Sequence, residues 1–250
     1  MVPDDCSSSD GKHLDFVRLL MQWHKENRRD FPWRTRRDPF TALLAEILLQ
    51  RTPASRVAGF FPSFIEKFPT PLSIATTDLK ELENVLQPMG LKKRASWLTE
   101  LMKKICREYN GEIPDREDEL MKLPGVGLYT ARAVLSFGFK KDVAIVDVNV
   151  ARVLSRVFDA SSGKQRPSED VGLWAFAAEL VPKGSGLDYN EALLDHASLV
   201  CKKQPLCDLC PVSRLCNYYS RSRISNRKNS KETQKMPKTR GKTGLGCRVT

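Results

Sequence analysis

The chain has 250 residues, of which 41% are hydrophobic and 28% charged, as in ordinary globular proteins. Its length excludes a disulfide-stapled miniprotein, and no stretch approaches the roughly 20 apolar residues that span a bilayer. The formal net charge is +11, but residues 221–250 hold ten basic residues and one acidic residue, so the body of the chain is nearly neutral. We expect a disordered basic tail over 220–250, because that segment has too few apolar residues to bury.

Apolar residues recur at helical spacing through most of the chain, whereas alternating strand patterns are scarce. The residues Pro69 and Pro71 are expected to end one of these helices. The sequence therefore predicts an all-α protein of roughly ten helices. The expected segments are 14–26, 39–51, 60–68, 78–87, 92–109, 115–122, 128–138, 147–158, 168–181 and 189–200.

The segment LPGVGLYTA, residues 123–131, lies between two predicted helices. Its residues Gly125, Val126 and Gly127 permit a tight turn that exposes backbone amides at the start of the next helix. Such a turn can hold a DNA phosphate without contacting a base. An ordinary connection between two helices is the alternative for this motif taken alone.

Asp147 follows the apolar run VAIV and directly precedes a predicted helix, with Asn149 two residues later. Aspartate is among the best helix N-caps, so a structural role is sufficient to explain it. A carboxylate held by helix-start amides also stays ionised, and it can stabilise positive charge that develops on a nearby sugar. The structural and the catalytic role are compatible with each other.

Four of the seven cysteines lie within sixteen residues, which favours a metal site over disulfides. Their spacing, with gaps of five, two and five residues, suits either a zinc ion or an iron–sulfur cluster. Lys202 and Lys203 lie inside this run and are candidate phosphate contacts, with solvated loop charge as the alternative. The four candidate ligands are Cys201, Cys207, Cys210 and Cys216.

The LPGVG hairpin, Asp147 and the cysteine run together resemble the helix-hairpin-helix, Gly/Pro…Asp superfamily of DNA base-excision glycosylases, over about residues 14–219. The resemblance implies that Asp147 is the catalytic aspartate and that the cysteines hold a 4Fe-4S cluster. The first cysteine gap is one residue shorter than in most such relatives, so zinc stays open. The implied architecture is a six-helix domain over 33–142, containing the hairpin, and a helical iron–sulfur domain formed by 11–32 with 143–219.

Glu46 lies among apolar residues in ALLAEILLQRT, and a buried glutamate is either paired or retained for function. The resemblance implies that Glu46 is the acid that faces the target base. Tyr129 stands where the endonuclease III branch has a lysine that attacks the sugar. A phenol forms no Schiff base, which implies hydrolysis without strong lyase activity. Gln50 and Arg51 are candidates for filling the vacated base stack or contacting the opposite base, with a polar helix end as the alternative.

The resemblance leaves several substrates open. Adenine glycosylases usually have a GLGYYARA-like segment and a C-terminal domain that recognises oxidised guanine. This sequence has MGLKKRASWL instead, and only 34 residues follow Cys216, which favours thymine or uracil opposite guanine. The alternative substrate is adenine opposite guanine or 8-oxoguanine. The non-enzymatic alternative is a zinc-stabilised module that only binds DNA. We expect double-stranded DNA with a mismatched base as the partner, a monomer, and no membrane association. The expected location is the cytoplasm, or the nucleus in a eukaryote.

Overall fold

The computed structural model describes residues 9–160 and 169–224, which form helices and connecting loops without a strand. The predicted all-α fold is therefore confirmed. No helix in the described part of the chain is long and apolar enough to cross a membrane. The α-helices are α1 Ser9–Asn27, α2 Pro39–Leu49, α3 Ala54–Lys67, α4 Pro71–Thr76, α5 Leu79–Leu86, α6 Ala95–Tyr109, α7 Glu117–Leu120, α8 Leu128–Phe137, α9 Val148–Phe158, α10 Val171–Glu179 and α11 Gly186–Leu199. The short 3₁₀ helices are η1 Pro32–Arg34, η2 Gln87–Met89, η3 Lys92–Arg94, η5 Cys207–Leu209 and η6 Ser213–Leu215.

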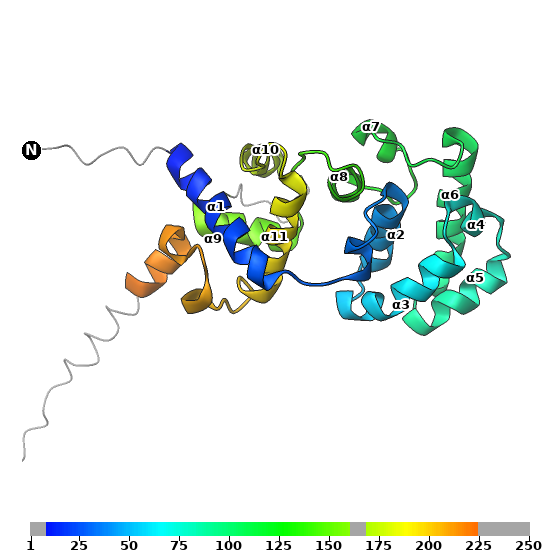
Figure 1. The fold of residues 1–250 in the computed structure, drawn as a ribbon, viewed down its shortest axis with the longest axis horizontal. Coiled ribbons are helices and arrows are strands. Elements are labelled where there is room, and N and C mark those ends of the chain that lie inside the picture. Colours follow the sequence, from blue (N-terminus) through cyan, green and yellow to red (C-terminus); the bar gives the residue numbers. More distant parts are fainter. Residues whose placement is uncertain (1–8, 161–168, 225–250) are drawn as a thin grey trace, which may run out of the picture.

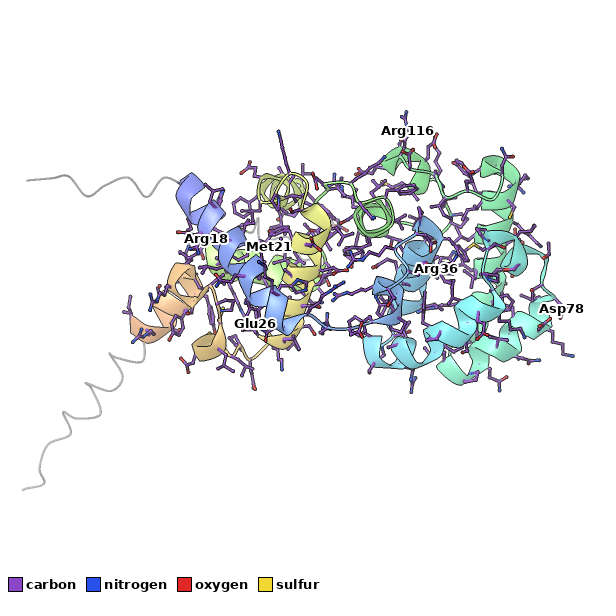
Figure 2. All side chains as sticks on the ribbon, in the orientation of Figure 1. Arg18, Met21, Glu26, Arg36, Asp78 and Arg116 are labelled. Carbon is purple, nitrogen blue, oxygen red and sulfur yellow. The ribbon has the colours of Figure 1, made fainter. Side chains whose placement is uncertain are left out.

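The helices gather around two hydrophobic cores. One core is built from residues between Phe40 and Leu135, and the other from Phe16 and Leu20 together with residues between Ala144 and Cys216. Figure 1 shows α1, α9, α10 and α11 at one end and α3 to α7 at the other. Figure 2 shows Arg18 on the first group of helices and Asp78 on the second. The first helix and the C-terminal helices therefore form one group, and the helices between them form the other.

Helix α2 lies at the junction of the two groups and is buried on most of its faces. Asp38 caps its N-terminus by accepting a hydrogen bond from the Thr41 amide at 2.9 Å, and Pro39 occupies the first turn. Leu43, Leu44 and Ile47 are almost completely buried and pack into the first core. This packing fixes the direction in which the remaining face of α2, with Glu46, points.

A network of buried charges ties α11 to the segment between α1 and α2. The Asp195 carboxylate accepts hydrogen bonds from His24 Nε2 at 3.0 Å, from Arg29 Nε at 2.6 Å and from Arg34 Nη1 at 2.8 Å. Burial alone would raise the pKa of Asp195, but these hydrogen bonds lower it below its usual range. The paired charges therefore hold the two helical groups in a fixed relation.

The structure corrects two helix boundaries that the sequence suggested. Pro71 begins α4 instead of ending a helix, because Thr70 and Ser73 form a capping box and proline suits the first turn. Pro62 lies inside α3, which begins at Ala54, earlier than the predicted start. The hydrophobic contacts of Phe61 and Phe64 on α3 outweigh the missing amide of the proline.

The predicted start of the disordered tail at residue 220 is wrong by several residues. Residues 217–224 are helical, and Arg221 pairs with Asp159 at the end of α9. Tyr219 also packs against the second core, which supplies the apolar contact that the composition of the tail did not suggest. The rest of the predicted tail, 225–250, lies outside the described residues, as does most of the loop before α10.

Candidate active site

A pocket of about 280 Å³ opens where the two helical groups meet. This volume is near the lower end for small-molecule sites and suits one planar ring system. The pocket receives side chains from the α1–α2 segment, from α2, from α8 and α9, and from α11. It is lined by Arg29, Phe31, Trp33, Arg34, Arg37, Ala42, Ala45, Glu46, Leu49, Thr52, Ala54, Tyr129, Phe137, Asp147, Asn149, Glu191, Leu194 and Ser198.

Glu46, Tyr129 and Asp147, which the sequence singled out, line this one pocket although they come from three different helices or their caps. The Tyr129 hydroxyl is close enough to the Glu46 carboxyl group to act on its pKa. Burial and the negative charge of Asp147 raise the pKa of Glu46 to about 7, against the lowering effect of the Tyr129 hydrogen bond. Burial and both carboxylates raise the pKa of Tyr129 well above its usual value, so the phenol stays neutral. The pocket thus holds an acid that exchanges its proton near neutral pH.

Asp147 caps the N-terminus of α9. Its Oδ1 atom accepts hydrogen bonds from the backbone amides of Asn149 at 2.9 Å and Val150 at 2.7 Å. Its Oδ2 atom accepts one from the Asn149 side-chain amide at 2.7 Å. Three donors at the start of the helix therefore fix the orientation of the carboxylate at the pocket. Asp147 therefore caps α9 and lines the pocket at the same time.

A chain of hydrogen bonds connects Asp147 with the cysteine-rich loop. Arg152 donates from Nη1 to Asn149 Oδ1 at 3.0 Å, which orients the Asn149 amide so that its Nδ2 faces Asp147. The same guanidinium donates to the carbonyl oxygens of Cys201 at 2.9 Å and Ala197 at 3.0 Å. The orientation of the carboxylate therefore depends on the position of the loop that begins at Cys201.

One wall of the pocket was not recognised from the sequence. Phe31 and Trp33 stack with ring centroids 4.7 Å apart and an angle of 10° between their planes. Arg34 pairs with Glu191 on α11, at 3.6 Å, as well as with Asp195. Neither Phe31 nor Trp33 was a predicted site residue, because the local sequence does not show that this segment meets α11 through Arg34. A short aromatic and arginine cluster between two helices was the available signal.

The turn between α7 and α8 adopts the conformation that its glycines suggested. Gly125 has φ +71°, in the left-handed region, and its side-chain position is filled by the Trp97 ring. Gly127 is the N-cap of α8 and gives the first helical amides no side-chain acceptor, while Val126 is buried between the two glycines. These amides and the helix dipole suit an anionic ligand such as a phosphate.

Replacing Gly125 by alanine is expected to lower the free energy of unfolding by about 2–4 kcal/mol, since the methyl group is strained at positive φ and overlaps Trp97. Gly127→Ala is the matched control, because a Cβ there meets no atom within 4 Å. Urea unfolding of both variants measures the difference. Equal destabilisation of the two variants would contradict this account of the turn.

Comparison with known proteins gives a consistent family. Residues 44–172 match the family described as HhH-GPD superfamily base excision DNA repair protein. A Pyrobaculum aerophilum protein described as a thymine/uracil-DNA glycosylase is 36% identical over 225 residues, covering 86% of this chain and 98% of that protein. The chain belongs to the HhH-GPD superfamily. The resemblance predicted from the hairpin and Asp147 is therefore confirmed.

Two further relatives of this HhH-GPD protein differ in their described substrate. A solved structure of a thermostable thymine-DNA glycosylase superposes with a TM-score of 0.81 at 36% identity, covering 85% of this chain and 99% of that one. An adenine DNA glycosylase from Rattus norvegicus is 33% identical over 216 residues, covering 82% of this chain and 42% of that protein. The predicted helix-hairpin-helix glycosylase fold is thus confirmed.

The four predicted ligand cysteines of the HhH-GPD chain surround one small cavity beside α11. Burial, together with the neighbouring Cys201 and Cys216 sulfurs, raises the pKa of Cys210 to about 12. Four sulfur donors crowded in an apolar setting suit a positively charged, thiolate-ligated group, because such a group stabilises the ionised sulfurs. No three His, Cys, Asp or Glu side chains of the described residues are arranged to hold a single metal ion.

The remaining predicted DNA contacts do not line the pocket. The Gln50 side chain reaches the carbonyl oxygen of Gly125 at 3.5 Å, so the end of α2 lies beside the hairpin, and Arg51 is exposed next to it. Lys202 and Lys203 are exposed in the cysteine loop, and their carbonyl oxygens accept hydrogen bonds from Arg156. Their side chains therefore remain available to a ligand outside the pocket.

Proposed function

We propose that the chain is a monofunctional, mismatch-specific DNA glycosylase that hydrolyses the N-glycosidic bond of thymine or uracil opposite guanine. The observation that carries the proposal is the single pocket in which Glu46, Tyr129 and Asp147 meet. The described names of the Pyrobaculum aerophilum relative and of the superposed thymine-DNA glycosylase support the choice of base.

The pocket sets the order of events. A base within a duplex is inaccessible at its glycosidic carbon, so the nucleotide is rotated out of the stack, and a mismatch lowers the free energy needed. The extruded base enters between the Phe31–Trp33 wall and Glu46, which brings its sugar to Asp147. The Asp147 carboxylate then stabilises the positive charge that develops on the sugar as the bond breaks, and water completes the hydrolysis.

The residues around the pocket support hydrolysis without strand cleavage. A lyase reaction of this class begins with an amine that attacks the sugar and forms a Schiff base. Among the described residues that line the pocket there is no lysine, and the residue two positions after Gly127 is Tyr129. The neutral Tyr129 phenol serves instead to hold Glu46.

Adenine remains the second candidate base, and one observation favours it. Loss of adenine is assisted by protonation of the ring, and Glu46 with its pKa of about 7 is able to donate a proton at neutral pH. The rat adenine DNA glycosylase shows that this branch is also related to the chain. For thymine or uracil, protonated Glu46 instead donates a hydrogen bond to a base oxygen.

A panel of duplexes tests the proposed function. Single-turnover excision is measured on G·T, G·U, A·G and A opposite 8-oxoguanine, with alkali to cleave the abasic product. We expect excision from G·T and G·U to be at least about tenfold faster than from the adenine duplexes, the equivalent of about 1.4 kcal/mol of discrimination. The reverse order supports the adenine alternative, and binding without excision supports a DNA-binding module.

The same reaction without alkali tests the absence of lyase activity. We expect intact abasic strands and no covalent adduct when borohydride is present, since the pocket lacks an amine nucleophile. Efficient trapping of the protein on DNA would contradict the monofunctional assignment.

We also propose that Cys201, Cys207, Cys210 and Cys216 hold a 4Fe-4S cluster, with zinc as the alternative. The group would fix the loop whose Cys201 carbonyl holds Arg152. Purified protein is expected to be yellow-brown and to contain iron and acid-labile sulfide. Stoichiometric zinc in a colourless, active protein would contradict the cluster.

Further proposals concern DNA contacts and domains. The amides at Gly125 to Gly127 are proposed to hold a phosphate of the strand, and Lys202 and Lys203 to contact the backbone near the cysteine loop. The two hydrophobic cores support the division into 33–142 and 11–32 with 143–219.

A further inference from the structure

The turn that follows α2 has a strained backbone. Arg51 has φ +55°, a left-handed conformation that is unfavourable for a residue with a side chain. Gln50, just before it, ends the helix in an extended conformation and points its side chain toward the hairpin at Gly125. Such a conformation persists only where surrounding contacts stabilise it.

Arg94 supplies those contacts from a distant part of the chain. Its half-buried guanidinium, at the end of η3, donates to the carbonyl oxygen of Ile47 at 3.0 Å and to that of Gln50. These two carbonyls belong to the end of α2, where no further helical amide is available to them. Charge-assisted bonds from one rigid, planar group therefore fix both the helix end and the turn.

The same arrangement places two cations side by side. Burial and the nearby charge of Arg51 both lower the pKa of Arg94, yet the guanidinium stays charged at neutral pH. Two adjacent guanidinium groups beside the hairpin favour an anionic polymer at the end of α2. Arg51 is exposed and points to solvent, whereas Arg94 is engaged with the backbone.

We propose that Arg94 is a positioning residue, which holds the 50–52 turn so that Gln50 enters the base stack left open by the extruded nucleotide. This inference rests on the proposed function, because it presumes an extruded base. Arg94 does not line the pocket, and it acts through Gln50.

A double-mutant cycle tests this coupling. Single-turnover excision from a G·U duplex is measured for Arg94→Ala, Gln50→Ala and the double variant. We expect each single variant to be slower by about tenfold or more, and the double variant to be no slower than either, since both changes remove the same event. Multiplicative losses in the double variant would overturn the proposal, as would an unchanged rate in Arg94→Ala.

Two matched variants separate position from charge and from folding. Lys93→Ala removes a neighbouring, exposed positive charge from the same 3₁₀ turn, and it is expected to excise at the rate of the wild type when DNA is saturating. Arg94→Lys is expected to recover part of the rate, because an ammonium can reach one of the two carbonyls. Equal losses in Lys93→Ala and Arg94→Ala would assign the effect to charge alone and overturn the proposal.

A binding measurement gives a readout that does not depend on excision. The duplex carries an abasic-site analogue beside 2-aminopurine, whose fluorescence rises when it is unstacked. Wild-type protein is expected to quench this fluorescence as Gln50 fills the gap, and Arg94→Ala to quench it at most half as much while thermal unfolding shows a folded protein. Equal quenching by the wild type and Arg94→Ala overturns the proposal, and so does an absence of quenching by the wild type. If the wild type excises no base, the proposed function fails, whereas this measurement still tests Arg94.

Discussion

Replacing Asp147 by asparagine is expected to reduce excision by about 10³-fold or more, while binding to a G·T or G·U duplex persists. The amide still offers its oxygen to the amides of Asn149 and Val150, so the cap of α9 is retained. It carries no negative charge, so it cannot stabilise the developing charge on the sugar. Single-turnover kinetics and a gel-shift titration measure the two effects separately.

Asp78→Asn is the matched control for this experiment. Asp78 also caps a helix, accepting from the amides of Lys80 and Glu81, but it does not line the pocket. Figure 2 shows it at the outer edge of the second helical group. We expect this variant to excise at the wild-type rate. Near-wild-type excision by Asp147→Asn would remove the catalytic role of that carboxylate.

Replacing Glu46 by glutamine is expected to slow excision by about 10²-fold and to stabilise the fold above neutral pH. Burial and the Asp147 charge raise the pKa of Glu46 to about 7 in the folded protein, compared with 4.5 for an ordinary glutamate. Between these two values the folded state binds more protons than the unfolded state, so stability falls as pH rises from about 4.5 to 7. The neutral amide escapes this loss, worth up to roughly 3 kcal/mol at pH 8.

Urea unfolding at pH 4.5 and pH 8 measures the predicted difference. Glu46→Gln is expected to exceed the wild type in stability at pH 8 only, whereas the exposed Glu66→Gln shows no pH-dependent change. In parallel, wild-type excision is expected to fall as the pH rises above about 7, and this fall is expected to be absent in Glu46→Gln. An equal stability gain at both pH values would contradict the raised pKa.

The helices were largely predictable because each depends on local spacing of apolar residues. The wrong helix boundaries arose where the same residue type is found both at the end and at the beginning of helices. Pro71 ends a helix or begins one, and the capping box of Thr70 with Ser73 decides for the beginning. Residues 220–224 looked too polar to fold, yet Arg221 finds Asp159 across the fold. That ion pair joins distant segments, and so no local pattern contains it.

The residues of the candidate site also fall into two classes, those with a local sequence signature and those without one. Asp147 and the hairpin were recognisable because helix caps and glycine turns have local signatures, and Glu46 because an acid interrupts an apolar helix. Glu191 was not recognised as a pocket residue, since its ion pair with Arg34 forms only when α11 returns to the α1–α2 segment. Trp33 was missed because its ring meets Phe61 of α3, a contact between distant segments. Sequence motifs therefore predicted three residues that the structure brings into one pocket, whereas the walls of that pocket required the fold.

A crystal structure of Asp147→Asn with a G·U duplex tests the central claim most directly. The account predicts uracil rotated out of the duplex, seated between the Phe31–Trp33 wall and Glu46, with its C1′ atom beside residue 147. It also predicts Gln50 in the vacated stack. A uracil that stays paired, or that is extruded to a place away from this pocket, would contradict the account.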